Sequence, residues 1–242
     1  MTDEPLFGAR MAGALWLTVI VVSIVALIGG ISVNVHGDPG TLAANALASA
    51  SKIRLAVVLF FFGKICYLGG TVLLYELLEP VDKSVALFGA FCGLAGLLSG
   101  GAGHFNLLTA LSLLEESRRA TEPVASQLQA AANILLGTAP RFGGEDVWFG
   151  FQLLSVGYLI ARSRFIPRAL GVLLVAGGLS FLATSFTNFV SPALGDRLAP
   201  RLLPIVLLGE SALALWLVVR GVNVEQWRLA IAGRSTINPA AR

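Results

Sequence analysis

The stretch RLAVVLFFFGKICYLGGTVLLYELL, residues 54–78, is long and apolar enough to cross a bilayer as one helix. Lipid offers no partner for backbone polar groups, so a spanning run must close its hydrogen bonds within itself. Comparable apolar runs occupy residues 11–33, 85–111, 147–163, 169–190 and 203–221. The sequence therefore predicts an all-α fold, an integral membrane bundle of six transmembrane helices.

Composition supports this class. Of the 242 residues, 56% are hydrophobic and 13% are charged, whereas soluble domains have about 25% charged residues. The net charge of +3 forms no basic stripe, which excludes nucleic acid as a partner and leaves the lipid bilayer. We expect an N-terminal tail (1–10), a six-helix transmembrane domain (11–221) and a basic C-terminal tail (222–242) with Trp227 at the membrane interface. The first apolar run is too long for the hydrophobic part of a cleavable signal peptide, so we expect it to remain in the protein as a membrane anchor.

An even number of spans puts both termini on one side of the membrane. That side holds the turns 79–84 and 163–168 and carries more Lys and Arg than the other side. The positive-inside rule therefore favours cytoplasmic termini. On the opposite, outer side, the segments 38–47 and 121–135 show helix-start signals and helical spacing of apolar residues. They predict short amphipathic helices, lying on the outer membrane surface or packed on the span ends.

The third run contains glycines at spacings of four, three, four and three, which place them on one helix face. They are Gly89, Gly93, Gly96, Gly100 and Gly103. A face without side chains lets a neighbouring helix approach closely, which predicts helix packing. The same face could instead receive a flat ligand or a lipid.

Several runs carry polar residues that are costly in lipid and usually face a partner or a water-filled cavity. Lys64 lies in the second run and Glu210 in the sixth. His104, Gln152 and Asn188 lie in the outer parts of the third, fourth and fifth runs. Together they predict a polar cavity open to the outer side that binds a ligand or relays protons, with a Lys64–Glu210 pair as one arrangement. Each residue also has a purely structural interpretation, such as a protonated Glu210 or a snorkelling Lys64.

No pattern indicates catalysis or a metal. Cys66 and Cys92 form no CxxC motif, only His36 and His104 are present, and the chain has no HExxH or GxSxG motif. We assign no catalytic residue and no metal ligand, and the sequence indicates no cofactor.

Recognisable motifs are spread over residues 9–222. They include Phe149-Gly150, Gly157-Tyr158-Leu159, Leu170-Gly171-Val172-Leu173, Gly209-Glu210 and Leu215-Trp216-Leu217. Together these motifs resemble a bacterial multipass membrane family catalogued as domain-of-unknown-function family 4386. The resemblance implies a six-helix protein of the bacterial inner membrane without an assigned activity. Glu210 falls in the family's Gly-Glu position, and Lys64 matches no family motif.

Three functions remain open. The first is a protein that binds or transports a small molecule or a proton in the outer cavity. The second is a non-catalytic accessory or scaffold subunit, with another membrane protein or a second copy of the chain as its partner. The third is a membrane-embedded enzyme that modifies lipids, which the missing catalytic motifs disfavour.

Overall fold

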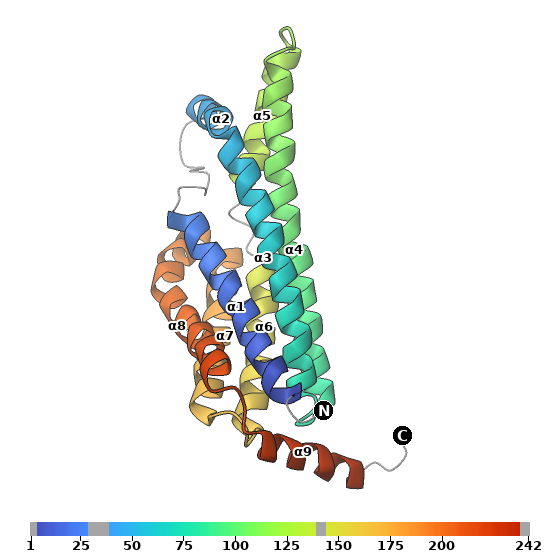
Figure 1. Ribbon diagram of the computed structural model, residues 1–242. Helices are drawn as coiled ribbons and strands as arrows, with labels where there is room; N and C mark the ends of the chain where they lie inside the picture. The colour runs from blue at the N-terminus through green and yellow to red at the C-terminus, as the bar shows by residue number, and fades with distance from the viewer. Residues whose placement is uncertain (1–3, 29–38, 139–143, 238–242) are drawn as a thin grey trace. The chain divides into compact units, whose positions relative to one another are not determined.

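The structure is a computed structural model that describes residues 4–28, 39–138 and 144–237. The regular structure in these ranges is α-helical (Figure 1). Among the described residues, five helices are long and apolar enough to cross a membrane, and Val124–Leu136 is a shorter apolar helix, which confirms the all-α membrane bundle. Helix α6, at the predicted run 147–163, is not among these five, so its crossing of the membrane stays a prediction. The helices are α1 (Glu4–Ile28), α2 (Pro39–Ala48), α3 (Ala50–Leu78), α4 (Lys83–Ser117), α5 (Val124–Thr138), α6 (Gly144–Arg162), α7 (Arg168–Val190), α8 (Pro192–Val219) and α9 (Val224–Ile237).

Most helices agree with the predicted runs, and the short helices expected at 38–47 and 121–135 correspond to α2 and α5. Helix α8 begins eleven residues before the predicted residue 203 (203 − 192). Pro192 lies in its first turn, where no intrahelical N–H bond is needed. Pro200 and Pro204 lie inside the helix, and each removes one backbone hydrogen bond without ending it.

The two ends of the chain are more helical than the sequence suggested. Helix α1 begins at Glu4, inside the segment predicted as the N-terminal tail, and α9 lies within the predicted C-terminal tail. Asn223 caps α9 by accepting a hydrogen bond from the Gln226 backbone N–H at 3.1 Å. An Asn at the cap position followed three residues later by Gln is a helix-start signal, so this helix could have been predicted.

The described chain forms two compact units whose boundaries pass through helices. Unit 1 comprises Met1–Ile20, Ile65–Gly96 and Asp146–Arg242. It contains α7 to α9, all but the first two residues of α6, the start of α1, the second part of α3 and the first part of α4. Helix α9 follows α8 after a short connection and runs away from the end of α8 (Figure 1).

Close approach of helix backbones holds unit 1 together. A Cβ added at Gly157 of α6 would lie 2.7 Å from the Gly171 carbonyl oxygen of α7. A Cβ added at Gly13 of α1 would lie 2.7 Å from the Ala214 carbonyl oxygen of α8. Carbon and its neighbours normally keep about 3.5–4.0 Å, so these crossings require the absence of a side chain.

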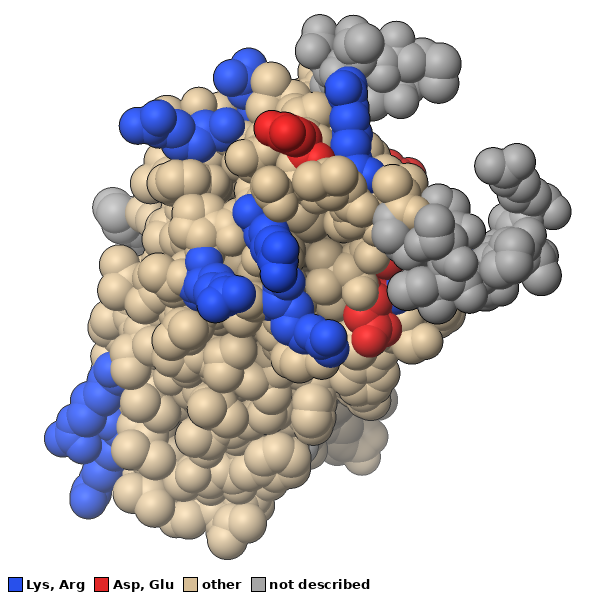
Figure 2. All heavy atoms as spheres, turned by 90° about the horizontal axis from the view of Figure 1, so that it is seen from below, with Lys and Arg blue, Asp and Glu red and all other residues tan. Residues whose placement is uncertain are grey.

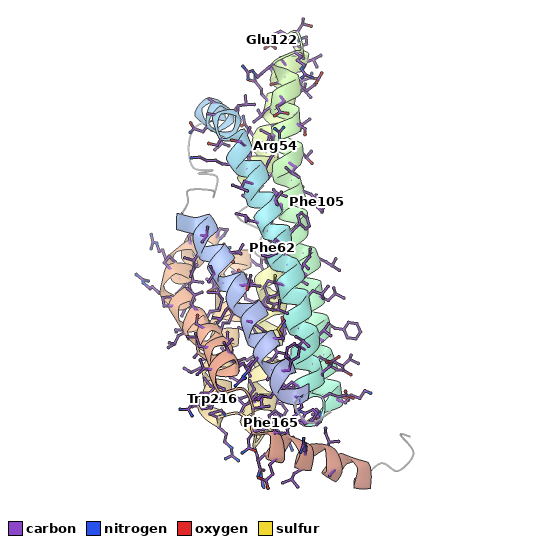
Figure 3. All side chains as sticks on the ribbon, viewed as in Figure 1. Arg54, Phe62, Phe105, Glu122, Phe165 and Trp216 are labelled. Atoms are coloured by element: carbon purple, nitrogen blue, oxygen red, sulfur yellow. The ribbon has the colours of Figure 1, made fainter. Side chains whose placement is uncertain are left out.

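Unit 2 comprises Val21–Lys64 and Leu97–Glu145 and has its own apolar core. Helices α2 and α5 pack on the first part of α3 and the second part of α4. Outside this core, Phe62 and Phe105, labelled in Figure 3, are 51% and 56% exposed, as apolar side chains that face lipid are. The core residues are Leu42, Ala46, Ile53, Ala110, Leu111, Leu114, Ala132 and Leu136.

Candidate functional site

An ion pair in unit 2 joins Lys64 to the first turn of α6. The Nζ atom of Lys64 lies 3.2 Å from Oε2 of Glu145, and the two side chains are 20% and 28% exposed. The same Nζ atom lies 4.6 Å from the centroid of the Phe60 ring, within the range of a cation–π interaction. The ammonium group is therefore held by an acid and an aromatic face while part of it remains accessible.

Gly100 of α4 makes room for the acid of this pair. A Cβ added at Gly100 would lie 1.7 Å from Oε2 of Glu145, so the carboxylate occupies the space that a side chain would take. The Gly100 carbonyl oxygen lies 3.1 Å from Nδ1 of His104, which donates to it when Nδ1 carries the proton. The His104 ring stacks on Phe60 with centroids 3.4 Å apart and an interplanar angle of 16°.

These contacts bring two predicted residues, Lys64 and His104, to one place in unit 2. Phe60 touches both of them, and Glu145 joins the group as the partner of Lys64. We name Lys64, Glu145, His104, Phe60 and Gly100 the charge site. Sequence patterns singled out Lys64, His104 and Gly100 and assigned no role to Glu145, which lies just before the fourth predicted run.

The depth of the charge site in the membrane follows from the positions of its residues along their helices. Lys64 is the middle residue of the 29-residue helix α3, and Glu145 is the second residue of the 19-residue helix α6. At 1.5 Å per residue α6 is about 28 Å long, which matches the roughly 30 Å of a bilayer's hydrocarbon core. When α6 crosses the membrane, its first turn and the charge site therefore lie near one membrane surface.

A buried polar cluster in unit 1 is centred on Gln152, which is 1% exposed. The Tyr67 hydroxyl donates a hydrogen bond to Oε1 of Gln152, and Nε2 of Gln152 donates to the Thr71 hydroxyl at 3.2 Å. A Cβ at Gly93 would lie 2.7 Å from the amide of Gln152, so this glycine provides the space for the amide. We call Tyr67, Thr71 and Gln152 the amide cluster. Its hydrogen bonds satisfy a polar group that would otherwise be costly to bury.

A cavity of about 10 Å³ lies beside the amide cluster, lined in part by Thr71, Gln152 and Ser155. That volume corresponds to about one water molecule. Polar side chains on its wall provide the hydrogen-bond partners that a buried water needs. The larger polar cavity open to the outer side stays a prediction.

Glu210 of α8 is half-buried and lies within electrostatic range of Asp146, at the start of α6. The position of Glu210 along the helix axes follows from the glycine contacts made close to it on α8. Gly209 lies against the Leu173 backbone of α7, and Gly13 of α1 lies against Ala214, one turn from Glu210. One turn along α1 from Gly13 is Trp16, whose ring lies 5.3 Å from the Tyr67 ring. Register therefore puts Glu210 at about the level of the amide cluster in unit 1.

The remaining predicted residues lie elsewhere. Asn188 lies near the end of α7 beside Gly195 of α8, where a Cβ on that glycine would lie 2.8 Å from the Asn188 backbone. Lys64 and Glu210 belong to different compact units, so a pair between them stays a prediction. His36 lies outside the described residues. Gly103 lies in α4 with the other four glycines of the predicted stripe.

Three of these glycines face α6 within unit 1. A Cβ at Gly89 would lie 3.0 Å from the Ser155 side chain, and a Cβ at Gly96 would lie 2.5 Å from the Phe149 ring. Gly93 faces Gln152 between them, as described above. Within the described residues, no group of three His, Cys, Asp or Glu side chains is arranged to hold a metal ion.

Comparison with protein families matches residues 11–221 to a domain of unknown function, DUF4386. Comparisons with curated proteins and with solved structures return no match. The family match covers the apolar helices and both sites, and it brings no activity with it.

Proposed function

We propose that this chain, which belongs to the DUF4386 family, is a multipass inner-membrane protein that binds or moves a proton or a small charged molecule at the charge site. The observation that carries this proposal is the Lys64–Glu145 pair, whose charged atoms are 3.2 Å apart and whose side chains are only 20% and 28% exposed. Ionisable side chains in apolar helices are costly and are characteristic of ion and proton pathways.

The electrostatics of the charge site favour a proton or a small ion over a bulky ligand. Opposite charges 4 Å apart attract by about 4 kcal/mol at an effective dielectric constant of 20. Removing a proton from Lys64, or adding one to Glu145, cancels this attraction and frees both groups. His104 lies within the same set of contacts, and its imidazole ring has one nitrogen that can donate a proton and one that can accept a proton.

A relay through His104 uses its two ring nitrogens differently. When Nδ1 donates to the Gly100 carbonyl oxygen, Nε2 carries a lone pair that can accept a proton. Stacking on Phe60 holds the ring in one orientation while protons are exchanged. In this mechanism Glu145 exchanges the proton, Lys64 sets the charge of the resting state, and His104 passes the proton on. Gln152, Glu210 and Asn188 are proposed as ligand-binding or relay residues within unit 1.

The test is proton flux through full-length protein reconstituted in liposomes that contain a pH-sensitive dye. With a potassium diffusion potential imposed by valinomycin, we expect Lys64→Met and Glu145→Gln to lower the initial rate at least tenfold, because each leaves one charge unpaired. His104→Phe, which keeps the stacked ring without its nitrogens, should lower the rate severalfold. Each tenfold loss corresponds to about 1.4 kcal/mol of barrier.

Helices α3 and α4, which carry Lys64 and His104, also provide a matched control in unit 2. Arg54 of α3 and Glu115 of α4 form an ion pair at 2.8 Å, with side chains 58% and 40% exposed. Such exposed pairs contribute about 0–1 kcal/mol, so Arg54→Met and Glu115→Gln should leave the rate within twofold of the unaltered protein. Flux equal to that of empty liposomes, or flux unaffected by Lys64→Met, would refute the proton mechanism.

The orientation in the membrane is part of the proposal. Figure 2 looks onto the end of unit 1 where α9 and the helix turns lie, and Lys and Arg side chains are spread over it, with Asp and Glu among them. The α6–α7 turn carries Arg164, and Arg168 begins α7. By the positive-inside rule this end faces the cytoplasm, which puts both termini inside and the start of α6 at the outer surface.

A second function is favoured by the glycine contacts of unit 1. Helices held backbone to backbone at Gly157 and Gly171 form a fixed framework, as an accessory or scaffold subunit requires. If this is the function, purification in mild detergent should retain a stoichiometric partner chain, measured by mass photometry and peptide sequencing. A chain that remains monomeric and alone in the membrane extract at native expression level would contradict it.

A further inference from the structure

A groove of about 640 Å³ lies in unit 1, at the end that carries the α6–α7 turn and α9. Its walls are the start of α1, the end of α3 and one face of α9. Phe7, Leu73 and Ile231 give it apolar surface, and Trp227 closes one side. A groove of this size accommodates part of an acyl chain and a headgroup rather than a single ion.

The groove is held open by hydrogen bonds at the start of α9. Trp227 Nε1 donates to the Leu77 carbonyl oxygen at 3.0 Å. That oxygen belongs to the last turn of α3 and has no partner within its own helix. The Asn223 backbone N–H donates to the Phe165 carbonyl oxygen at 3.0 Å, which fixes the residue before α9 to the α6–α7 turn. Helix α9 therefore has a defined place in unit 1 instead of being a loose tail.

The charges of the groove select the headgroup. Both ionisable side chains that line it, Glu76 and Glu79, are acids. Glu79 is paired with Lys83 at 3.3 Å, whereas Glu76 is exposed on the face of α3 that borders the groove. An acid beside apolar walls favours a cationic group attached to an apolar chain and repels an anionic headgroup. The basic side chains spread around this end of unit 1 (Figure 2) favour a phosphate at the same level.

We propose that this groove binds an aminophospholipid of the phosphatidylethanolamine type from the cytoplasmic leaflet. The primary ammonium donates to the Glu76 carboxylate, and the phosphate faces the surrounding basic side chains. One acyl chain lies along Phe7, Leu73 and Ile231. Trp227 lies at the headgroup level, where tryptophan side chains concentrate in membrane proteins. This inference rests on the proposed orientation for the choice of leaflet, but it uses a groove of unit 1 and none of the residues of the charge site.

Lipid retention tests the proposal. The full-length protein is purified in a mild detergent, incubated with equal amounts of phosphatidylethanolamine and phosphatidylglycerol of identical acyl chains, and examined by native mass spectrometry. We expect the unaltered protein to retain the ethanolamine lipid about tenfold more than the glycerol lipid, as a charge-assisted hydrogen bond provides. Glu76→Gln should bring this ratio close to one, because the amide attracts an ammonium far less.

Two further variants distinguish headgroup from chain. Glu116 of α4 is an exposed acid of unit 2, and Glu116→Gln should leave the tenfold ratio intact. Ile231→Gln should reduce retention of both lipids severalfold without changing their ratio, because it removes chain contact only. A ratio near one in the unaltered protein, or a tenfold ratio that survives Glu76→Gln, would overturn the proposal.

Discussion

Gly157→Ala is expected to destabilise the protein by about 1–3 kcal/mol, the usual cost of forcing an extra group into a packed interior. The added Cβ would lie 2.7 Å from the Gly171 carbonyl oxygen and 2.9 Å from the Val175 backbone nitrogen. Both obstacles are backbone atoms, so no side chain can rotate away and α6 must separate from α7. Gly157→Leu should prevent the two helices from packing at all. Thermal unfolding in detergent, followed by circular dichroism, measures the loss.

The control for this prediction is another helical glycine of unit 1. A Cβ added at Gly8 of α1 meets nothing within 4 Å. Gly8→Ala should therefore be neutral or should stabilise the protein, since alanine favours a helix over glycine by about 1 kcal/mol. Equal unfolding temperatures for Gly8→Ala and Gly157→Ala would show that the α6–α7 crossing is looser than the structure indicates.

Gln152→Leu is expected to cost about 1–3 kcal/mol, although leucine has nearly the same size. The change removes the Gln152 acceptor of the Tyr67 hydroxyl and the Gln152 donor of the Thr71 hydroxyl, and all three side chains are buried. Thr71 can turn its hydroxyl toward its own helix, which limits its share of the cost. The loss should therefore come mainly from Tyr67.

A double-mutant cycle separates this loss from a packing defect. Tyr67→Phe removes the hydroxyl and keeps the ring, which packs 5.1 Å from Phe149. If the hydrogen bond is the cause, Gln152→Leu should cost much less in the Tyr67→Phe background, and the two effects should be far from additive. Additive effects would assign the loss to the shape of leucine beside Gly93 instead.

Hydropathy predicted the helices well because the membrane constrains them strongly. A run such as 54–78 has one structure available in lipid, whatever its neighbours are. The beginning of α8 was missed because its first turns contain Asp196, Arg197 and two prolines, which interrupt the apolar signal. Tertiary contacts and a proline in the first turn keep that segment helical, and neither is visible as hydropathy.

The sequence was sufficient to predict which residue types form the candidate sites, but not which residues contact one another there. Lys64, Tyr67 and Thr71 are spaced three and four residues apart, which puts them on one face of α3, and this polar stripe was a usable signal. The partner of Lys64 depends on which helix approaches that face. The acid at the start of α6 pairs with it, a contact that depends on the helix arrangement and on the space left at Gly100. No local pattern encodes that approach.

Helix α4 has 35 residues and is about 52 Å long, far more than the hydrocarbon thickness of a bilayer. Even at the largest common tilt of about 40°, roughly a quarter of its length would extend beyond the hydrocarbon. In unit 2, Ala110, Leu111 and Leu114 are covered instead by Leu42 of α2 and Leu136 of α5. Helices α2 and α5 thus cover, in place of lipid, the part of α4 that extends beyond the hydrocarbon. The excess length of α4 is therefore covered by other helices of the same chain, and the surrounding bilayer does not have to thicken to cover it.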